Sequence, residues 1–261
     1  MREGTDEGLW ARKCFLKLCL GRWSREGRPP KCFVVPCLNE EENVLGTIET
    51  ITKAMERVDC RFEILVFDDG SQDNTSGVVA AYQSANPQAP VRLFRNKVNR
   101  GLACNFVEGA FQGRGRYYRA VPGDNVELAE SLEKIIQARG TADVIVPYFL
   151  EIRNRPLRRK IISKLYTHLV NLASGYRLAY YNGNPLYLRA HVLRFHVECT
   201  GFGYQAEFLT RLISEGATLK QIPLVSYDRE GSTAINIKNL LSVTHSLLTI
   251  ALRRLRIVLF D

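Results

Sequence analysis

The sequence lacks any apolar run long enough to cross a membrane. Spanning the hydrocarbon core takes about 20 consecutive apolar residues, and no segment of the 261 residues supplies them. Lys13, Lys17 and Arg22 interrupt the apolar residues near the start of the chain, so a secretory signal peptide is not expected there. These absences favour a cytoplasmic protein whose membrane contacts, if it makes any, are peripheral on the inner membrane face.

Paired cysteines and zinc-binding patterns are missing as well. The seven cysteines are an odd number, none forms a Cys-x-x-Cys pair, and the four histidines show no ligand spacing with them. Cys32 and Cys37 fall in or beside a predicted buried strand, where cysteine behaves as a small hydrophobe. We therefore expect reduced thiols in a cytosolic protein, and no zinc site.

Positive charge is in excess, and it is unevenly distributed. Lysine and arginine number 36 against 27 aspartates and glutamates, and the excess gathers in residues 1–28, 153–160 and 253–256. Clusters of this kind fit an anionic lipid surface, nucleic acid or a phosphorylated substrate, or they are simply solvated. Nucleic acid is the disfavoured partner, because the cations are scattered among acidic strand ends and no recognised module appears.

From residue 31 onwards, apolar runs of strand length alternate with helical patterns. This order predicts one α/β domain over residues 31–261, with a mostly parallel sheet, helices on both faces and a C-terminal amphipathic helix. Residues 1–30 are expected to form a basic tail, either disordered or lying at a membrane interface. The predicted strands are 32–36, 62–67, 91–94, 117–121, 144–147, 185–188 and 219–225, and the predicted helices are 41–58, 74–85, 102–112, 128–138, 157–174, 206–215 and 239–256.

Three of the predicted strands end in acidic residues. Asp68 and Asp69 close a buried apolar run, Glu40 follows the first strand, and Asp124 follows the fourth. The carboxyl ends of parallel strands share one edge of a sheet, which is where open α/β sheets bind ligands. The arrangement suits a polyphosphate held through a divalent cation, and it predicts an enzyme. The alternative is a set of capped turns that begin helices, with Asp73 or Asn74 as the cap after the second strand.

Four motifs follow one another at these strand ends. They are Val35-Pro36-x-x-Asn39-Glu40-Glu41, Phe67-Asp68-Asp69-Gly70-Ser71-x-Asp73-x-Thr75, Asn99-Arg100-Gly101 and Gly123-Asp124-Asn125. The series resembles the inverting family 2 glycosyltransferases, and within them the dolichyl-phosphate mannose synthase and polyprenyl-phosphate glycosyltransferase branch. The resemblance covers about residues 31–256. It implies a GT-A fold, which is Rossmann-like, and a hexosyltransferase activity.

The resemblance assigns a nucleotide-sugar donor, UDP- or GDP-linked, to the strand ends. The residues that it places against the nucleotide are Pro36, Leu38, Glu40, Phe67, Asp68, Asp69 and Gly123. It also implies a divalent cation, Mg²⁺ or Mn²⁺, on Asp124 and Asn125, since hard cations take oxygen ligands beside substrate phosphates. The family's Asp-x-Asp motif is reduced here, because Pro122 replaces its first aspartate, and Glu127 is a further possible ligand.

The second half of the chain carries the residues that the resemblance links to the acceptor. Glu207 is either a carboxylate beside the acceptor or a solvated helix charge, and Arg229 matches a phosphate-binding arginine. Together with Asp124, these two are the predicted catalytic residues. Phe149 replaces an arginine that the family carries after the fifth strand, and Arg153 or Arg155 is the candidate substitute.

The reaction implied is a single in-line displacement from a nucleotide-diphosphate sugar. The expected acceptor is a polyprenyl phosphate at the cytoplasmic membrane surface, with the apolar-rich segment 239–252 either lying on the bilayer or packed on the domain. Two alternatives stay open. One is transfer to a hydroxyl of a saccharide or other acceptor, which needs a general base. The other is a nucleotide-binding protein without turnover.

Overall fold

The structure is a computed structural model that describes residues 31–195, 203–227 and 237–260. Within residues 237–242, and at Phe260, only the backbone is described. The predicted N-terminal tail, residues 1–30, and the segment that contains Arg229 therefore lie outside the described residues.

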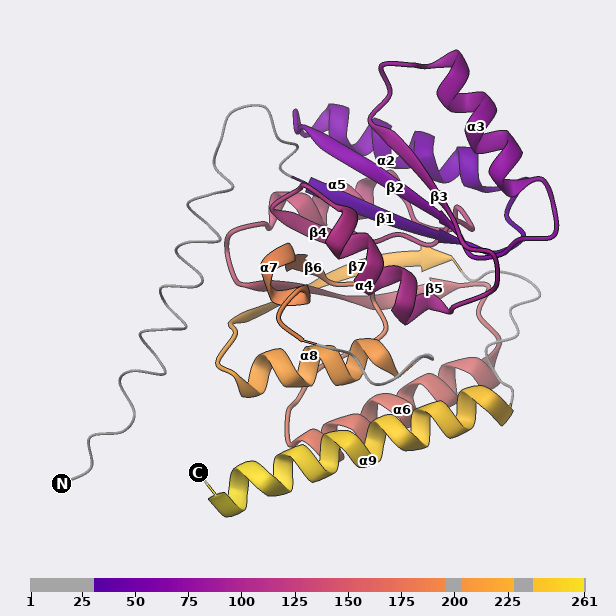
Figure 1. Ribbon diagram of the computed structural model, residues 1–261. Coiled ribbons are helices and arrows are strands. Elements are labelled where there is room, and N and C mark those ends of the chain that lie inside the picture. Colours follow the sequence, from indigo (N-terminus) through magenta and orange to yellow (C-terminus); the bar gives the residue numbers. More distant parts are fainter. Residues whose placement is uncertain (1–30, 196–202, 228–236, 261) are drawn as a thin grey trace.

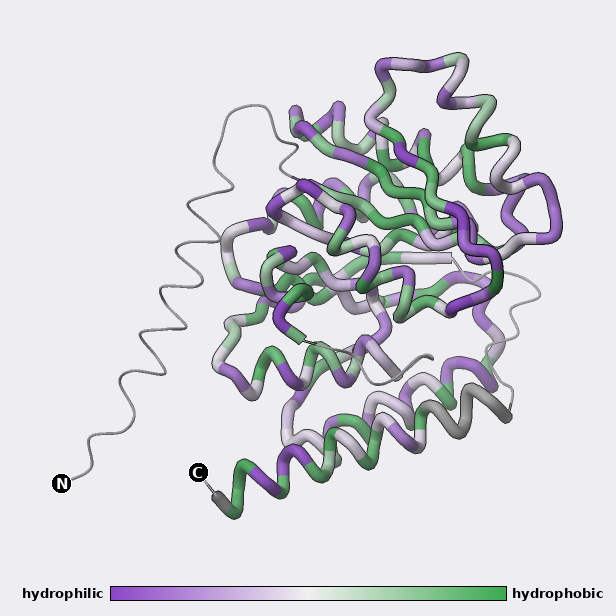
Figure 2. The backbone as a smooth tube through the Cα atoms, viewed as in Figure 1, coloured by the Kyte–Doolittle hydropathy of each residue, from purple (hydrophilic) through white to green (hydrophobic). Residues whose placement is uncertain are grey.

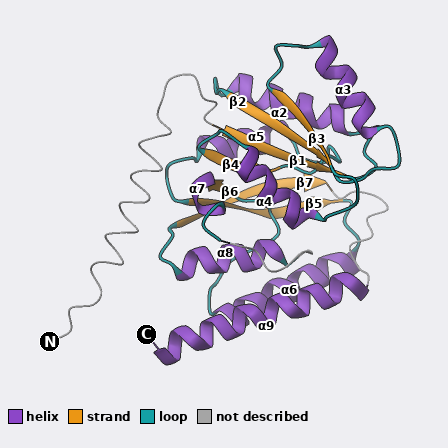
Figure 3. Cartoon of the chain, in the orientation of Figure 1, coloured by secondary structure: helices purple, strands orange, loops and turns teal. Residues whose placement is uncertain are grey.

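A seven-stranded sheet lies at the centre of the protein (Figures 1 and 3). Its strand order is β3-β2-β1-β4-β6-β5-β7, and only β6 runs antiparallel to its neighbours. The prediction of a mostly parallel α/β sheet is confirmed. The strands are β1 (Lys31–Cys37), β2 (Phe62–Asp68), β3 (Val91–Arg95), β4 (Tyr117–Ala120), β5 (Val144–Arg153), β6 (Leu186–Leu188) and β7 (Leu219–Tyr227).

Helices cover both faces of the sheet (Figure 1). One face is covered by α2 (Val44–Arg57), α3 (Thr75–Ala85) and α5 (Ala129–Gln137). The other face is covered by α4 (Leu102–Gln112), α7 (Arg189–Val192) and α8 (Tyr204–Ser214). Beyond them, α6 (Leu157–Ser174) and α9 (Ile237–Phe260) lie side by side as an outer layer. None of the helices in the described part of the chain has both the length and the hydropathy needed to cross a bilayer.

The strands are mostly apolar because each one contributes to two cores. In β1, Cys32 and Val34 face the core beneath α4 and α8, while Phe33 and Val35 face the core beneath α2 and α5. A strand that is buried on both faces has no solvent side, so its sequence does not alternate between apolar and polar. Figure 2 shows the central strands as predominantly hydrophobic.

The structure departs from the predicted elements mainly in the second half. Strand β5 was expected to end at Pro147 but continues to Arg153, because its exposed end pairs with β7 through a bulge after Phe149. The partner strand lies some 70 residues away in the sequence, so no local pattern reports it. The short α7 was not predicted. By contrast, the bounds of α4 and α6 agree with the prediction.

Candidate active site

Backbone hydrogen bonds continue past the ends of β1 to β4 and hold their following loops at one edge. Asp69 N donates to the Cys37 carbonyl oxygen at 2.8 Å, and Gly123 N donates to the Pro36 carbonyl oxygen at 3.2 Å. On the far side of β2, Asn96 N donates to the Asp68 carbonyl oxygen at 2.9 Å. The predicted convergence of acidic strand ends at one edge of the sheet is confirmed.

Several carboxylates act electrostatically on the thiol at the end of β1. Burial raises the pKa of Cys37 well above its usual value, and the nearby negative charges of Glu40, Asp68, Asp124 and Asp73 raise it further. Gly123 packs against this thiol so closely that a Cβ there would lie 2.5 Å from Cys37 Sγ. Glycine at position 123 therefore lets the loop of Asp124 close over the end of β1.

Asp68 and Asp69 hold the loops of this edge in place. Each is only 5% exposed. Asp68 accepts hydrogen bonds from Ser71 N at 2.9 Å and from the Ser76 hydroxyl. These bonds fix the turn that leads into α3, as the alternative reading of this motif predicted.

Asp69 reaches instead to the loop between β3 and α4. Its Oδ1 accepts from the Asn96 amide and from Arg100 N, both at 2.8 Å, and its Oδ2 accepts from Gly101 N at 2.9 Å. Gly101 has a φ of +87°, which glycine adopts without strain, and α4 begins at the next residue. The Asn-Arg-Gly motif is therefore hydrogen-bonded to the Asp-Asp motif. Asp69 holds the loop between β3 and α4 in place, and any contact with a ligand would be a second role.

The loops after β1 and β2 are joined in the same way. Glu40 N donates to Thr75 Oγ1 at 2.9 Å, and Asn74 N donates to Glu41 Oε2 at 2.8 Å. Asn74 occupies the N-cap position of α3, but the side chain that accepts from the first helical N–H is that of Asp73, whose Oδ1 lies 3.0 Å from Thr75 N. Reciprocal bonds of this kind satisfy backbone donors that helix starts leave unpaired, so they make the edge rigid.

The other predicted nucleotide contacts differ in how much surface they present. Leu38 is 44% exposed and Pro36 is partly exposed, so both can touch a ligand at this edge. Glu40 is buried, and its Oε2 accepts from the Asn43 amide at 3.0 Å. Phe67 is 1% exposed and stacks on Phe94 at a centroid distance of 4.8 Å. The Phe67 ring is therefore a core side chain that supports the loop, and the structure argues against direct contact with a nucleoside.

Among the predicted metal ligands, the structure favours Asp124 over its neighbours. The Asn125 Oδ1 accepts from Thr50 Oγ1 at 3.1 Å, and its amide nitrogen packs against Gly46 on α2. Asn125 therefore anchors the loop to α2 and directs its oxygen away from the acidic cluster. Glu127 is not available either. Both of its oxygens accept from the fully buried Arg119, at 2.8 and 2.6 Å.

Glu207 does not reach the strand-end edge as a free carboxylate. It is 2% exposed, and its Oε1 lies 3.6 Å from Arg253 Nη2, an ion pair between α8 and α9. Neither sequence-based reading of Glu207 anticipated this, because the partner lies 46 positions along the chain. The other predicted acceptor residue, Arg229, lies outside the described residues.

A pocket of 430 Å³ lies between the end of β5 and residues 160–171 of α6; its charged lining is mostly basic, with Glu151 as the acidic member, and we call it the cationic pocket. Because β5 runs parallel to β4, this pocket opens at the same edge of the sheet as Asp124. Lys160, Lys164 and His168 line it from one face of α6, and Arg155 enters from the preceding loop. The buried Arg155 Nε makes no hydrogen bond within the described part of the chain. Phe149, where the family carries an arginine, also lines the pocket.

Sequence reasoning missed Lys164 and His168, although a signal was present. With Lys160 they stand at i, i+4 and i+8 of a helix whose bounds were predicted correctly, and this spacing places them on one face. Of the two candidate substitutes for the missing arginine, Arg155 lines the pocket, whereas Arg153 lies over the Tyr227 ring at 5.8 Å. Asn96 was missed too, because a lone asparagine after a strand carries no distinctive pattern.

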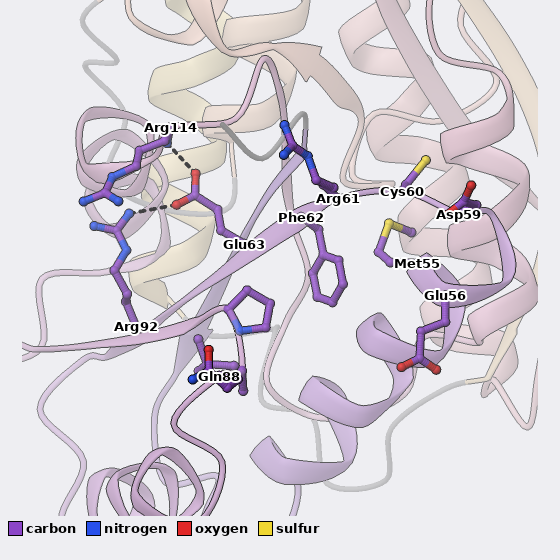
Figure 4. Close-up of a pocket in the computed structure, with 13 residues that line it drawn as sticks. Met55, Glu56, Asp59, Cys60, Arg61, Phe62, Glu63, Gln88, Arg92 and Arg114 are labelled. Carbon is purple, nitrogen blue, oxygen red and sulfur yellow. Dashed lines mark hydrogen bonds and ion pairs between the residues drawn. The ribbon is translucent and has the colours of Figure 1, made fainter. Parts of the chain in front are cut away.

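A second cavity, of 770 Å³, lies at the opposite edge, by the amino ends of β2 and β3 (Figure 4). Figure 4 shows Glu63 pointing between Arg92 and the backbone at Arg114. Glu63 accepts from Arg92 Nη2 at 2.9 Å, from Gly115 N at 2.8 Å and from Arg114 N. The acidic strand ends do not border this cavity, so its size does not make it the candidate active site.

Comparison with known sequences identifies the family. Residues 32–194 match the sequence pattern of glycosyl transferase family 2. A dolichyl-phosphate beta-glucosyltransferase from Trichomonas vaginalis is 32% identical over 117 residues, which cover 42% of this chain and 34% of that protein. The match thus spans about a third of the length of this curated relative.

Solved structures share the fold at low sequence identity. The glucosyl-3-phosphoglycerate synthase of Mycobacterium tuberculosis, solved with Mn²⁺, UDP and glucosyl-3-phosphoglycerate, has a TM-score of 0.61 at 19% identity, over 87% of this chain and 80% of that one. The mannosyl-3-phosphoglycerate synthase of Rubrobacter xylanophilus has a TM-score of 0.62 at 16% identity, over 92% and 76%. These likenesses confirm the predicted GT-A fold. Since the family pattern covers more than half of its residues, the chain belongs to glycosyl transferase family 2.

Proposed function

We propose that this protein is a hexosyltransferase that moves a sugar from a UDP- or GDP-linked donor to a polyprenyl phosphate at the cytoplasmic face of a membrane. One observation carries the proposal. The acidic cluster around Asp124 and the cationic pocket of Arg155, Lys160 and Lys164 open at the same edge of the sheet. A donor diphosphate with its cation suits the first, and an anionic acceptor suits the second.

The acidic edge fits a divalent cation that is shared with the donor. Within the described residues, no three acidic, histidine or cysteine side chains are close enough to enclose a metal ion. Mg²⁺ and Mn²⁺ sites of nucleotide enzymes often need only one or two carboxylates, since phosphate oxygens and water complete the coordination. Asp124 is the residue that would hold the cation, and such a cation stabilises charge on the departing diphosphate.

The state of Glu207 favours a phosphate acceptor over a hydroxyl acceptor. A hydroxyl must lose a proton as it attacks, which requires a general base within hydrogen-bond reach. Glu207 was the candidate base, but it is buried against Arg253. A phosphate monoester is largely ionised at neutral pH, because its second pKa is about 6. Its oxygen can attack the anomeric carbon directly, while the bond to the nucleoside diphosphate breaks and that diphosphate leaves with the electron pair.

The relatives support both halves of the proposal. The curated relative is a dolichyl-phosphate glucosyltransferase, whose name specifies a lipid phosphate acceptor. The mycobacterial synthase has been solved with Mn²⁺, UDP-glucose and phosphoglyceric acid, a soluble acceptor that also carries a phosphate. The cationic pocket is compatible with either acceptor. The exposed apolar residues of α6 next to the pocket favour the lipid.

The proposal is tested by identifying the product. Purified protein is incubated with a panel of UDP- and GDP-sugars, Mg²⁺ or Mn²⁺, and a polyprenyl phosphate, and the lipid fraction is analysed by mass spectrometry. We expect one donor to give a polyprenyl-phosphate sugar and a stoichiometric amount of nucleoside diphosphate. Donor binding by calorimetry without any transfer or hydrolysis would instead support the nucleotide-binding alternative. Transfer to a saccharide but not to the lipid would support the hydroxyl alternative.

A further inference from the structure

Two rows of apolar side chains lie exposed on the outer layer of the protein. One row runs along α6 and the other along α9, and Figure 2 shows hydrophobic residues recurring along both helices. We call these two rows the leucine face. Its members are Leu157, Ile161, Leu165, Leu169 and Leu172 on α6, and Leu248, Leu252, Leu255 and Leu259 on α9.

Both rows point away from the domain. Their members recur every three or four residues, so each row is a single helical stripe. The opposite stripe of α6 contains the buried Thr167 and Val170, and the opposite stripe of α9 contains the buried Ser246 and Ile250. Leu165 is 55% exposed and Leu252 is 64% exposed. Rows of exposed apolar side chains like these are uncommon on monomeric proteins and are typical of interaction sites.

The charged side chains that α6 and α9 themselves contribute have one sign. Neither α6 nor α9 contains an aspartate or a glutamate. The exposed cations beside the rows include Arg158, Lys160 and Lys164 on α6, and Arg254 and Arg256 on α9. Apolar rows flanked by cations alone are typical of helices that lie in the interface of an anionic bilayer.

We propose that the leucine face docks on an anionic lipid bilayer, with α6 and α9 lying in the interfacial plane. A second copy of this chain is the weaker candidate. A twofold interface joins the same patch of both subunits, so it would bring these cations against their own copies, and neither helix has an acidic side chain to pair with them. Lipid phosphates provide the opposite charge, and the acyl chains cover the leucines.

Docking in this orientation would also place the active site at the membrane. Helix α6 begins directly after β5, at the edge that carries Asp124 and the cationic pocket. Lys160 and Lys164 lie in the pocket while Ile161 and Leu165, on the same turns, belong to the leucine face. This step rests on the proposed function, because it presents the pocket to the phosphate of a membrane-embedded acceptor.

The surface is tested with the full chain and sedimenting vesicles of phosphatidylcholine, with or without phosphatidylserine. We expect the parent protein to bind the phosphatidylserine vesicles, and to bind less as salt rises. The double variant Leu165→Asp/Leu252→Asp should lower the partition coefficient at least about tenfold, since charge on the apolar stripe opposes insertion. The matched control is Phe111→Asp, an equally exposed apolar residue on α4 outside this face, which should bind like the parent.

Each result has one meaning. The docking proposal is overturned if the parent does not bind, or if the double variant binds as well as the parent. It is also overturned if analytical ultracentrifugation shows a parent dimer that the double variant dissociates. Failure of the proposed function looks different. In that case the parent binds vesicles but transfers no sugar to any polyprenyl phosphate. If both proposals hold, the double variant still uses a short, water-soluble polyprenyl phosphate but loses activity on the same acceptor embedded in vesicles.

Discussion

The two halves of the molecule treat charge in opposite ways. In the first half, from β1 to α5, acidic side chains gather at the strand ends and most of them accept hydrogen bonds from neighbouring loops. In the second half, Lys160, Lys164 and Arg155 line a pocket at the same edge, and the buried Arg155 Nε has no partner within the described residues. The acids build a rigid frame, while these cations remain available for a ligand.

This difference separates residues that hold the loops of the edge in place from residues that are proposed to contact substrate. Among the predicted acidic contacts, Asp68 and Asp69 each have a structural task that explains their presence without any ligand. Leu38, Asp124 and the cationic pocket are where a donor and an acceptor would meet the protein. Substitutions in the two groups should therefore fail in different ways: loss of stability for the frame, and loss of binding or turnover for the pocket.

The largest effect is expected at Asp124. Asp124→Asn keeps the size of the side chain but removes the negative charge proposed to hold the cation. Transfer should fall by about a hundredfold or more, a magnitude typical of losing a group that stabilises charge in the transition state. The matched control is Asn125→Ala, which removes the neighbouring amide anchored on α2 and should cost far less activity. Initial transfer rates of both variants are measured over a range of Mn²⁺ concentrations. Equal losses of transfer activity would contradict the assignment of Asp124 as the residue that holds the cation.

A smaller and more selective effect is expected in the cationic pocket. Arg155→Gln or Lys164→Gln should raise the KM for the phosphorylated acceptor about tenfold, since a hydrogen bond to a charged group contributes roughly 1.5–3 kcal/mol. The donor Kd, measured by calorimetry without acceptor, should not change. Arg153→Gln is the control, because Arg153 lies over Tyr227 and not in the pocket. If the donor Kd rises and the acceptor KM does not, the two regions have been assigned the wrong way round.

Substitution of Asp69 should lower the stability of the protein. Asp69→Ala removes the acceptor of the Arg100 and Gly101 backbone N–H groups and one of the two acceptors of the Asn96 amide. One unsatisfied buried donor costs about 1–3 kcal/mol, so the free energy of unfolding should fall by at least that amount. Urea unfolding provides the measurement, with the exposed Glu49→Ala on α2 as control. A variant that keeps full stability but loses donor binding would mean that Asp69 acts on the ligand and not on the loop.

The smallest effect concerns the thiol within the acidic cluster. The pKa of Cys37 is raised by burial first and then by Glu40, Asp68 and Asp124. In the unfolded chain the thiol ionises near pH 9, so above that pH the unfolded state binds fewer protons and stability falls. Cys37→Ala should flatten this alkaline loss. The free energy of unfolding of both proteins is measured by urea titration at pH 7 and at pH 10. If the difference between the two pH values is the same in parent and variant, Cys37 does not contribute to it.

Local patterns predicted the first half well because its features are local. Each strand is a short apolar run, each following loop is rich in acids, amides and glycine, and the helix caps lie within a few residues. The order of the four motifs was enough to predict the sheet edge and the place of Asp124 on it. The sequence did not reveal which groups each acidic residue binds, because the hydrogen-bond partners of Asp69 lie in a loop some 30 residues away.

The second half was harder to predict because its contacts are distant. The extension of β5 depends on β7, the ion pair of Glu207 depends on α9, and the exposure of the leucine face depends on which side of each helix is buried. A leucine on an amphipathic helix is normally read as core. Only the packing of α6 and α9 as an outer layer shows that these rows face outwards.

The central claim is that the acceptor atom is a phosphate oxygen, and one matched pair of acceptors tests it most directly. Sugar transfer is measured to a polyprenyl phosphate and to the polyprenol of the same chain length, in the same vesicles, with the same donor and cation. Because Glu207 is paired with Arg253, the account predicts product from the phosphate and none from the alcohol. Equal transfer to the alcohol would show that a general base operates, and it would contradict both the phosphate acceptor and the role given to the cationic pocket.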